Sequence, residues 1–146
     1  MWSEDNGPYQ GKHYQLAETL CSPAPISSPR PRILIGGSGE RKTLRLVAAY
    51  ADACNLFGDA GTIAHKLEVL HRHCDEVGRD PAQIEVTTLM NVDDDASPDT
   101  ILAEAESLAA VGVDTVMARS TTLTPAQWLE EVWGPVIPRL AAVGPA

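Results

Sequence analysis

Three glycines and a serine follow a short apolar run, and they are the residues of this sequence best suited to bind an anion. The segment Gly36-Gly37-Ser38-Gly39 comes after the run at residues 33–35 and before a helix that we expect to begin near Glu40. Glycines let backbone N–H groups approach an anion closely, a serine hydroxyl can donate, and a helix N-terminus adds partial positive charge. Arg41 and Lys42 add cationic side chains. We predict a phosphate site at this loop; a tight turn without a ligand is the alternative.

Two common phosphate motifs do not fit this loop. A dinucleotide-binding fingerprint needs glycine at the sixth position of its G-x-G-x-x-G frame, and counting from Gly37 that position holds Lys42. A Walker A loop needs Gly-Lys-Ser or Gly-Lys-Thr after four intervening residues, which this sequence lacks. The predicted site is therefore a phosphate loop of neither kind.

Further candidate residues stand after the second and fourth of the strands that we predict. Asn55 and Phe57 end the second strand, and Arg119 and Ser120 follow the fourth, where barrel enzymes place ligand-contacting residues. A surface salt bridge explains Arg119 equally well. Cys54 is expected in the core. No residue stands out as a general acid or base, so the catalytic residues are unassigned.

Two clusters of potential metal ligands have simpler structural explanations. His71, His73 and Cys74 are close in sequence, but helical spacing puts His71 and Cys74 on one side and His73 on another. The aspartates at residues 93–95 lie between a strand and a helix start, where acidic residues suit a solvated loop and the helix dipole. We therefore expect no metal site.

Short β-type runs alternate with helical patterns from Arg32 onward, which is typical of consecutive βα units. We place four such runs, at residues 33–35, 53–57, 84–92 and 115–118. The spacing of apolar residues predicts the buried faces of the first three helices to be Leu44, Val47, Ala48 and Ala51; Ile63, Leu67, Leu70, Cys74 and Val77; and Ile101, Ala105 and Leu108.

Capping residues predict where these helices begin and end. Gly78 and Gly112 are expected to end the second and third helices. Ser97-Pro98 is expected to open the third, and residues 124–127 form a capping box for the last. That last helix is expected to break near Gly134-Pro135 and to end by residue 140.

Four parallel strands joined by right-handed helical crossovers form either half of an eight-stranded barrel or a small open sheet covered on both faces. Residues 1–30 are rich in Gly and Pro, so we expect a loop or insertion segment with one edge strand at residues 13–16. The α/β domain is expected to span residues 31–142, with a tail at residues 143–146.

The composition excludes several classes of protein. A content of 44% hydrophobic and 21% charged residues fits an ordinary α/β protein. A net charge of -9 argues against nucleic-acid binding, which needs clustered Lys and Arg. Without a long apolar stretch or a leader pattern, we expect no membrane partner and a cytoplasmic location. Three cysteines, an odd number without paired spacing, suggest reduced thiols.

The glycine loop and its surroundings resemble a known family. The run Pro-Arg-Pro-Arg-Ile-Leu-Ile-Gly-Gly-Ser-Gly-Glu-Arg-Lys-Thr-Leu-Arg-Leu at residues 29–46, then Ala49-Tyr50-Ala51-Asp52 and Asn55, resembles the luciferase-like monooxygenase family, particularly members that depend on coenzyme F420. Val77-Gly78-Arg79-Asp80-Pro81 resembles the next turn of that family. The resemblance extends from about Gly7 to Leu140.

This resemblance implies a (β/α)8 TIM barrel in which the glycine loop after strand five helps to hold the cofactor's phosphate. Gly36, Gly37, Ser38 and Gly39 are then the implied cofactor-binding residues, and the four runs correspond to strands five to eight, the C-terminal half of the barrel. The implied activity is that of an oxidoreductase that uses F420, or alternatively FMN, for hydride transfer with a small organic substrate. In such enzymes the hydride chemistry belongs to the cofactor.

Two other hypotheses remain open at this stage. One is a catalytically silent half-barrel that self-associates, or that binds cofactor only with a partner, because four strands alone expose two parallel edges that invite pairing with another copy. We therefore expect a homodimer. The other is an unrelated open-sheet phosphate binder, which would have helices on both faces of its sheet.

Overall fold

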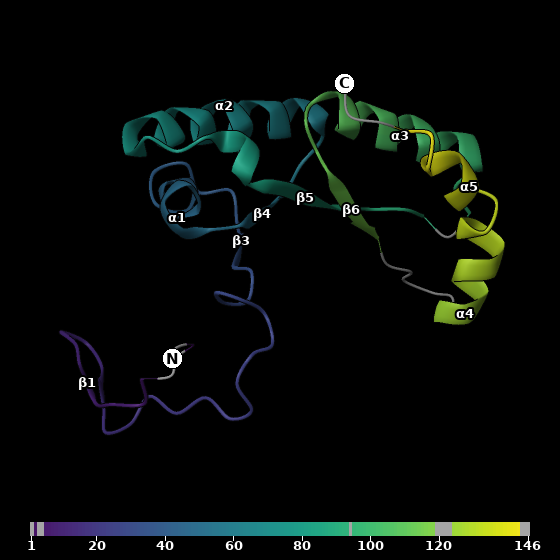
Figure 1. The fold of residues 1–146 in the computed structure, drawn as a ribbon. Coiled ribbons are helices and arrows are strands. Elements are labelled where there is room, and N and C mark those ends of the chain that lie inside the picture. Colours follow the sequence, from purple (N-terminus) through teal and green to yellow (C-terminus); the bar gives the residue numbers. More distant parts are fainter. Residues whose placement is uncertain (1, 3–4, 94, 119–123, 144–146) are drawn as a thin grey trace. The chain divides into compact units, whose positions relative to one another are not determined.

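The structure is a computed structural model, and it describes residues 2, 5–93, 95–118 and 124–143. The chain divides into two compact units, Met1–Arg32 and Ile33–Ala146. In the first unit, β1 (Tyr9–Gln10) pairs with β2 (Gln15–Leu16) as an antiparallel hairpin (Figure 1). The predicted edge strand at residues 13–16 is therefore shorter than expected and has a partner. No apolar side chain is buried among the described residues of this unit.

The second unit contains the four strands that the sequence predicts, in a parallel sheet. They are β3 (Leu34–Gly36), β4 (Ala53–Leu56), β5 (Glu85–Met90) and β6 (Thr115–Ala118), and they are hydrogen-bonded in chain order. The register aligns one residue of each strand in a row across the sheet: Gly36, Asn55, Thr87 and Thr115. The carboxyl ends of all four strands lie at the same edge.

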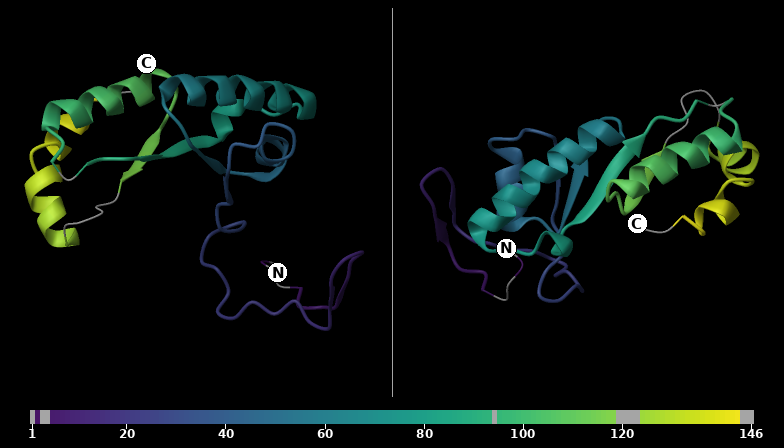
Figure 2. Two further views of the ribbon diagram at one scale, coloured as in Figure 1. Left: turned by 180° about the vertical axis from the view of Figure 1, so that it is seen from behind. Right: turned by 90° about the horizontal axis from the view of Figure 1, so that it is seen from above.

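Three helices cover one face of this sheet: α1 (Thr43–Tyr50), α2 (Ala60–Val77) and α3 (Pro98–Ala110) (Figures 1 and 2). Side chains alternate along a strand, so every second residue faces the helices. The strand residues in the same buried core as the helices are Ile35, Cys54, Leu56, Val86, Met90, Val116 and Ala118. In the described part of the chain, α1, α2 and α3 thus lie on one face, unlike the predicted alternative of a sheet covered by helices on both faces.

Several helix boundaries follow the predicted caps, but α1 begins at Thr43, after the start that was expected near Glu40, and it has no side-chain cap. Asp59 accepts a hydrogen bond from Thr62 N at 2.7 Å at the start of α2, and Gly78 ends that helix in the left-handed conformation, as predicted. Ser97 caps α3 as predicted. The predicted buried face of α2 is wrong at one residue: Val77 is 49% exposed, and Val69 is buried instead. Val77 is the last residue of α2, directly before the left-handed Gly78 at which the helix ends.

Two aspartates tie neighbouring strands together at the amino edge of the sheet. Asp52 precedes β4, and its Oδ2 accepts a hydrogen bond from the N–H of Ile33 at 2.7 Å. Asp114 precedes β6, and its Oδ2 accepts from the N–H of Val86 at the same distance. In both cases the aspartate stands opposite the donor residue in the register, so these two carboxylates occupy equivalent positions in the fold.

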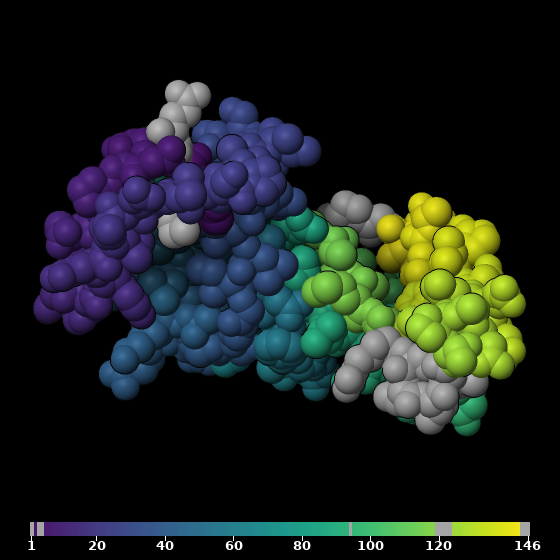
Figure 3. Space-filling view, turned by 90° about the horizontal axis from the view of Figure 1, so that it is seen from below, coloured from purple at the N-terminus to yellow at the C-terminus, as the bar shows by residue number. Residues whose placement is uncertain are grey.

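The chain ends in a series of short helical turns: α4 (Pro125–Trp128), a π-helical turn η2 (Leu129–Trp133) and α5 (Ile137–Leu140), which group together at one end of this unit (yellow in Figure 3). The capping box at Thr124 and Gln127 is confirmed. Gly134 is required because a Cβ there would lie 2.8 Å from the Glu130 carbonyl oxygen. A 3-10 turn, η1 (Pro81–Gln83), precedes β5. No described helix is both long enough and apolar enough to cross a membrane.

Candidate functional site

The glycine loop begins where β3 ends, at the carboxyl edge of the sheet. Gly36 is the last residue of β3, and a Cβ added to it would meet no atom within 4 Å. Gly37 turns the chain with a φ of +122°, a conformation that favours glycine. Its N–H donates to the carbonyl oxygen of Asn55 at 3.0 Å. The N–H of Gly37 thus ties the loop to β4, and it is not free to bind a ligand.

Ser38 and Gly39 complete the loop and connect it to its neighbours. Ser38 Oγ accepts a hydrogen bond from the N–H of Phe57 at 3.2 Å, so its own hydroxyl hydrogen stays available to donate. The Gly39 carbonyl oxygen accepts from Leu44 N at 3.0 Å. A Cβ on Gly39 would lie only 2.8 Å from Oγ1 of Thr43, so a larger residue there would require Thr43 to move.

The unengaged donors of the loop are the N–H groups of Ser38, Gly39 and Glu40, which have no acceptor within the described part of the chain. We call them the free loop amides. A hollow of about 390 Å³ lined by Gly39, Glu40, Arg41 and Lys42 adjoins them. Successive backbone N–H groups beside cationic side chains form an arrangement that attracts anions. Of the four residues predicted to bind phosphate, Gly37 has an engaged N–H, whereas the N–H of the next residue, Glu40, is free together with those of Ser38 and Gly39.

Glu40 is anchored to α2 by three side chains. Its carboxylate accepts from Lys66 Nζ at 2.5 Å and lies 3.2 Å from His65 Nε2. Its main-chain carbonyl lies 2.8 Å from His73 Nε2. The hydrogen bond and charge of Lys66 hold the pKa of the Glu40 carboxyl below its usual value. These contacts span 25 to 33 residues of sequence, and no motif in the sequence predicts them.

Asn55 contacts the glycine loop through its backbone carbonyl, whereas its side chain bonds to the neighbouring strand β5. It is only 6% exposed, and its Nδ2 donates to Thr87 Oγ1 at 2.9 Å. Thr87 donates in turn to the Cys54 carbonyl at 2.9 Å. Cys54 lies in the core as predicted, and burial raises the pKa of its thiol to about 11. The side chain of Asn55 is therefore a structural element beside the site.

Phe57 borders a second hollow at the same edge of the sheet. This hollow has a volume of about 400 Å³ and is lined by Phe57, Gly58, Asp59, Leu89, Asn91 and Glu104. Burial raises the pKa of the Glu104 carboxyl. Because Phe57 N bonds to Ser38 Oγ, the hollow adjoins the loop. The sequence prediction missed Asn91 and Glu104. The position of Asn91, directly after the third strand, could have revealed it.

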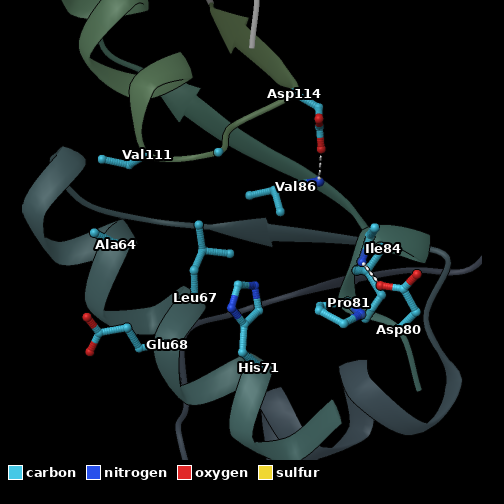
Figure 4. A pocket seen from close by; sticks show the side chains of 12 residues that line it. Ala64, Leu67, Glu68, His71, Asp80, Pro81, Ile84, Val86, Val111 and Asp114 are labelled. Carbon is cyan, nitrogen blue, oxygen red and sulfur yellow. Dashed lines mark hydrogen bonds between the residues drawn. The ribbon is translucent and has the colours of Figure 1, made fainter. Parts of the chain in front are cut away.

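The remaining sequence candidates do not converge on the loop as a group. His71 lines a groove of about 610 Å³ beside Leu67 of α2 at the amino ends of the strands (Figure 4), where Asp80 and Asp114 accept backbone hydrogen bonds. Cys74 is in the core, while His73 contacts Glu40. Residues 94, 119 and 120, and with them part of the aspartate cluster and the pair Arg119 and Ser120, lie outside the described residues.

The family of the chain follows from comparison with known proteins. Residues 1–132 match the family model of luciferase-like monooxygenases. This chain belongs to that family. The luciferase-like chain also resembles an F420-dependent secondary alcohol dehydrogenase in complex with an F420-acetone adduct, with a TM-score of 0.68 and 16% identity. It resembles the coenzyme F420 dependent tetrahydromethanopterin reductase from Methanopyrus kandleri with a TM-score of 0.71 and 15% identity.

These two likenesses cover 94% and 92% of the luciferase-like chain, but only 57% and 58% of the two solved proteins. The chain thus spans less than two thirds of the length of either structure. At these identities the likeness concerns the fold. A comparison with curated proteins found no match.

Proposed function

We propose that this luciferase-like chain is an oxidoreductase, or part of one, that holds the phosphate of a deazaflavin or flavin cofactor at Gly36-Gly37-Ser38-Gly39. The observation that carries the proposal is the loop itself: three adjacent free amides at the carboxyl edge of a parallel sheet, where α/β proteins bind their ligands. Both similar structures named above are F420-dependent enzymes, which favours F420 over FMN.

The residues of the loop fit a phosphate group. The space beside Gly36 is open, so no side chain blocks the approach to the loop at that point. The Ser38 hydroxyl has a hydrogen to donate, and Arg41 and Lys42 supply positive charge in a chain whose net charge is -9. Charge-assisted hydrogen bonds to phosphate are about twice as strong as neutral ones. A phosphate monoester or diester therefore suits this loop better than a neutral ligand does.

A bound deazaflavin or flavin would supply hydride transfer, for which the chain needs no acid or base of its own. The role of the protein would be to bind and to orient. The free loop amides would fix the phosphate end, and the apolar side chains of Phe57 and Leu89 in the adjoining hollow would exclude water near a small organic substrate.

The proposed site has a natural place in a larger barrel. We propose that β3 to β6 correspond to strands five to eight of a (β/α)8 barrel, with residues 31–142 as the cofactor-binding half and residues 1–30 as an insertion before strand five. The coverage of 57% and 58% of the two similar proteins supports this assignment. The glycine loop would then follow strand five.

The direct test compares ligands with and without the phosphate: FMN and riboflavin differ in that group alone, and a second pair differs in the chain that carries it. Purified chain is titrated with FMN and with riboflavin by fluorescence, and with F420 and its chromophore without the phosphate chain. We expect each phosphorylated ligand to bind at least about tenfold more tightly than its partner, the effect of one good charge-assisted interaction. Equal affinities within each pair, or no binding of any of the four, would overturn the proposal.

A second candidate function has its own supporting observation. On the face of the sheet opposite the helices, Leu34, Leu89 and Met117 are 53%, 45% and 39% exposed, and atoms of the β5–β6 region reach the surface seen in Figure 3. β3 and β6 each have a neighbour on one side only in the described part of the sheet. We propose that a second copy covers this face and both edges, so that two half-barrels close into one homodimeric barrel.

Light scattering tests this homodimer with a matched pair of variants. Leu89→Glu places a charge on the open face, whereas Leu46→Glu places one on α1, where Leu46 is equally exposed at 46%. We expect the Leu89 variant to be a monomer and the Leu46 variant to remain a dimer. Added salt should strengthen the dimer because each copy carries a charge of -9. A wild-type monomer at micromolar concentration would overturn this second proposal.

A further inference from the structure

Two separate sets of contacts hold the segment that leads into α1 and the last turns of α1: the first comes from α2, and the second from Arg79, which follows the cap of α2. At the end, Arg79 Nη1 donates to the carbonyl oxygens of Val47 and Ala48 at 3.4 and 3.1 Å. At the start, the contacts are those of Glu40 with Lys66 and His73, whose side chains are only 18% and 17% exposed. The two sets of contacts are independent, so each can be removed while the other remains.

The contacts at the start act on the glycine loop directly. Glu40 follows Gly39 without an intervening residue, and its own N–H is one of the free loop amides. The orientation of the peptide planes on either side of Glu40 therefore depends on where its carbonyl and its carboxylate are held. His73 fixes the carbonyl and Lys66 the carboxylate, so the two side chains together determine the direction of the last donor of the loop.

We propose that Lys66 and His73 are positioning residues of the glycine loop: by holding Glu40 against α2, they keep the free loop amides directed at one phosphate, a role that rests on the function proposed above. Neither side chain contacts the ligand itself. Their effect passes through Glu40, and preorganised donors bind an anion more tightly than donors that must first be ordered.

The ring of His73 lies between the Glu40 carbonyl and the Glu76 carboxylate. A carbonyl oxygen can only accept, so His73 Nε2 must donate to Glu40 O. His73 Nδ1 lies 3.2 Å from the Glu76 carboxylate, which also accepts. Only the ring with hydrogens on both nitrogens donates to both partners. The charged groups that face this contact are Glu76 on α2 and the Glu40 carboxylate with its partners His65 and Lys66.

The test measures FMN affinity together with amide hydrogen exchange at two hydrogen-bonded amides beside the loop, those of Gly37 and Leu44. Lys66→Met keeps the apolar stem and removes the charge, and His73→Leu removes the donor. We expect each to weaken FMN binding about tenfold, to leave riboflavin binding unchanged, and to accelerate exchange at both amides about tenfold, as for the loss of one charged hydrogen bond.

A conservative variant separates positioning from general stability. In His73→Gln the amide nitrogen can still donate to the Glu40 carbonyl. We expect FMN affinity close to that of the wild type at pH 6. His73→Leu, which lacks a donor, should bind FMN about tenfold more weakly than His73→Gln does. Equal FMN affinities for these two variants would contradict the role of the ring.

Two control variants lie on or beside the same helix. His71→Leu changes a residue that lines the groove at the other edge of the sheet, and Arg79→Met releases only the end of α1. If both controls alter FMN binding and loop exchange as much as His73→Leu does, the positioning role is overturned. If the wild type binds neither FMN nor F420, the proposed function fails, while exchange at Gly37 and Leu44 still decides whether Lys66 and His73 order the loop.

Discussion

Replacing Gly37 with alanine separates the backbone requirement of the loop from its chemistry. The φ of +122° at Gly37 is a conformation that alanine adopts only under strain, at a cost of about 1 to 3 kcal/mol. The added methyl group would lie 3.4 Å from Thr43 Cγ2, which is tolerable, so the strain is mainly in the backbone. Gly36→Ala is the matched control, because a Cβ there meets nothing within 4 Å and its φ is not positive.

The two variants should therefore differ in two measurements. In urea unfolding, we expect Gly37→Ala to lose about 1 to 3 kcal/mol and Gly36→Ala to stay within about 0.5 kcal/mol of the wild type. In ligand titration, relief of strain at Gly37 shifts the free loop amides, so the preference for FMN over riboflavin should fall about tenfold. If Gly37→Ala lowers stability but keeps the wild-type preference for FMN, the loop is a turn and the phosphate assignment is wrong.

Three further predictions concern stability. Asp59→Ala removes the side-chain cap of α2 and should lower the urea concentration at the midpoint of unfolding; no change would mean that another group caps the helix. The raised pKa of Cys54 means that its buried neutral thiol contributes fully to the free energy of unfolding below pH 9.0, and that this contribution is lost as the pH rises toward about 11. In thermal melts, Cys54→Ala should therefore show a smaller loss of stability at alkaline pH than the wild type. The lowered pKa of Glu40 means that its ionised carboxylate stabilises the folded state above pH 4.5, and that this stabilisation is lost as the pH falls through the folded-state pKa. Lys66→Met should therefore make the loss of stability in acid less steep. An unchanged acid profile would contradict the ion pair between Glu40 and Lys66.

The sequence predicted the elements of the second unit well because each is specified locally. Helix stripes, the αL glycine at residue 78 and the Ser97 cap all depend on residues within one or two turns of each other. The location of the loop could be predicted for the same reason. The π-helical turn at 129–133 has no comparable local pattern, and it was not predicted.

The contacts that complete the site could not be predicted in this way. That the N–H of Gly37 is engaged follows from the register between β3 and β4, which the sequence does not specify. That His73 contacts Glu40 follows from how α2 packs beside α1, over a separation of 33 residues. Glu104 enters the second hollow from α3. Each of these contacts depends on how helices and strands pack against one another, which the intrinsic helix or strand propensity of a residue does not specify.

Because of the aspartates at residues 52 and 114, the two edges of the sheet have different roles. At the amino edge they fasten adjacent strands by side chain to backbone bonds that involve no ligand. At the carboxyl edge the glycine loop is also tied to its neighbours, by Gly37 N to Asn55 O and by Phe57 N to Ser38 Oγ, whereas the described residues that follow β5 make no such bond between strands, so their sequence can change without loosening the sheet. Proteins with this fold can therefore acquire new substrates through substitutions at the carboxyl edge of the sheet, while the aspartates at the amino edge preserve the fold. Sequences should then diverge more at the carboxyl edge than at the amino edge.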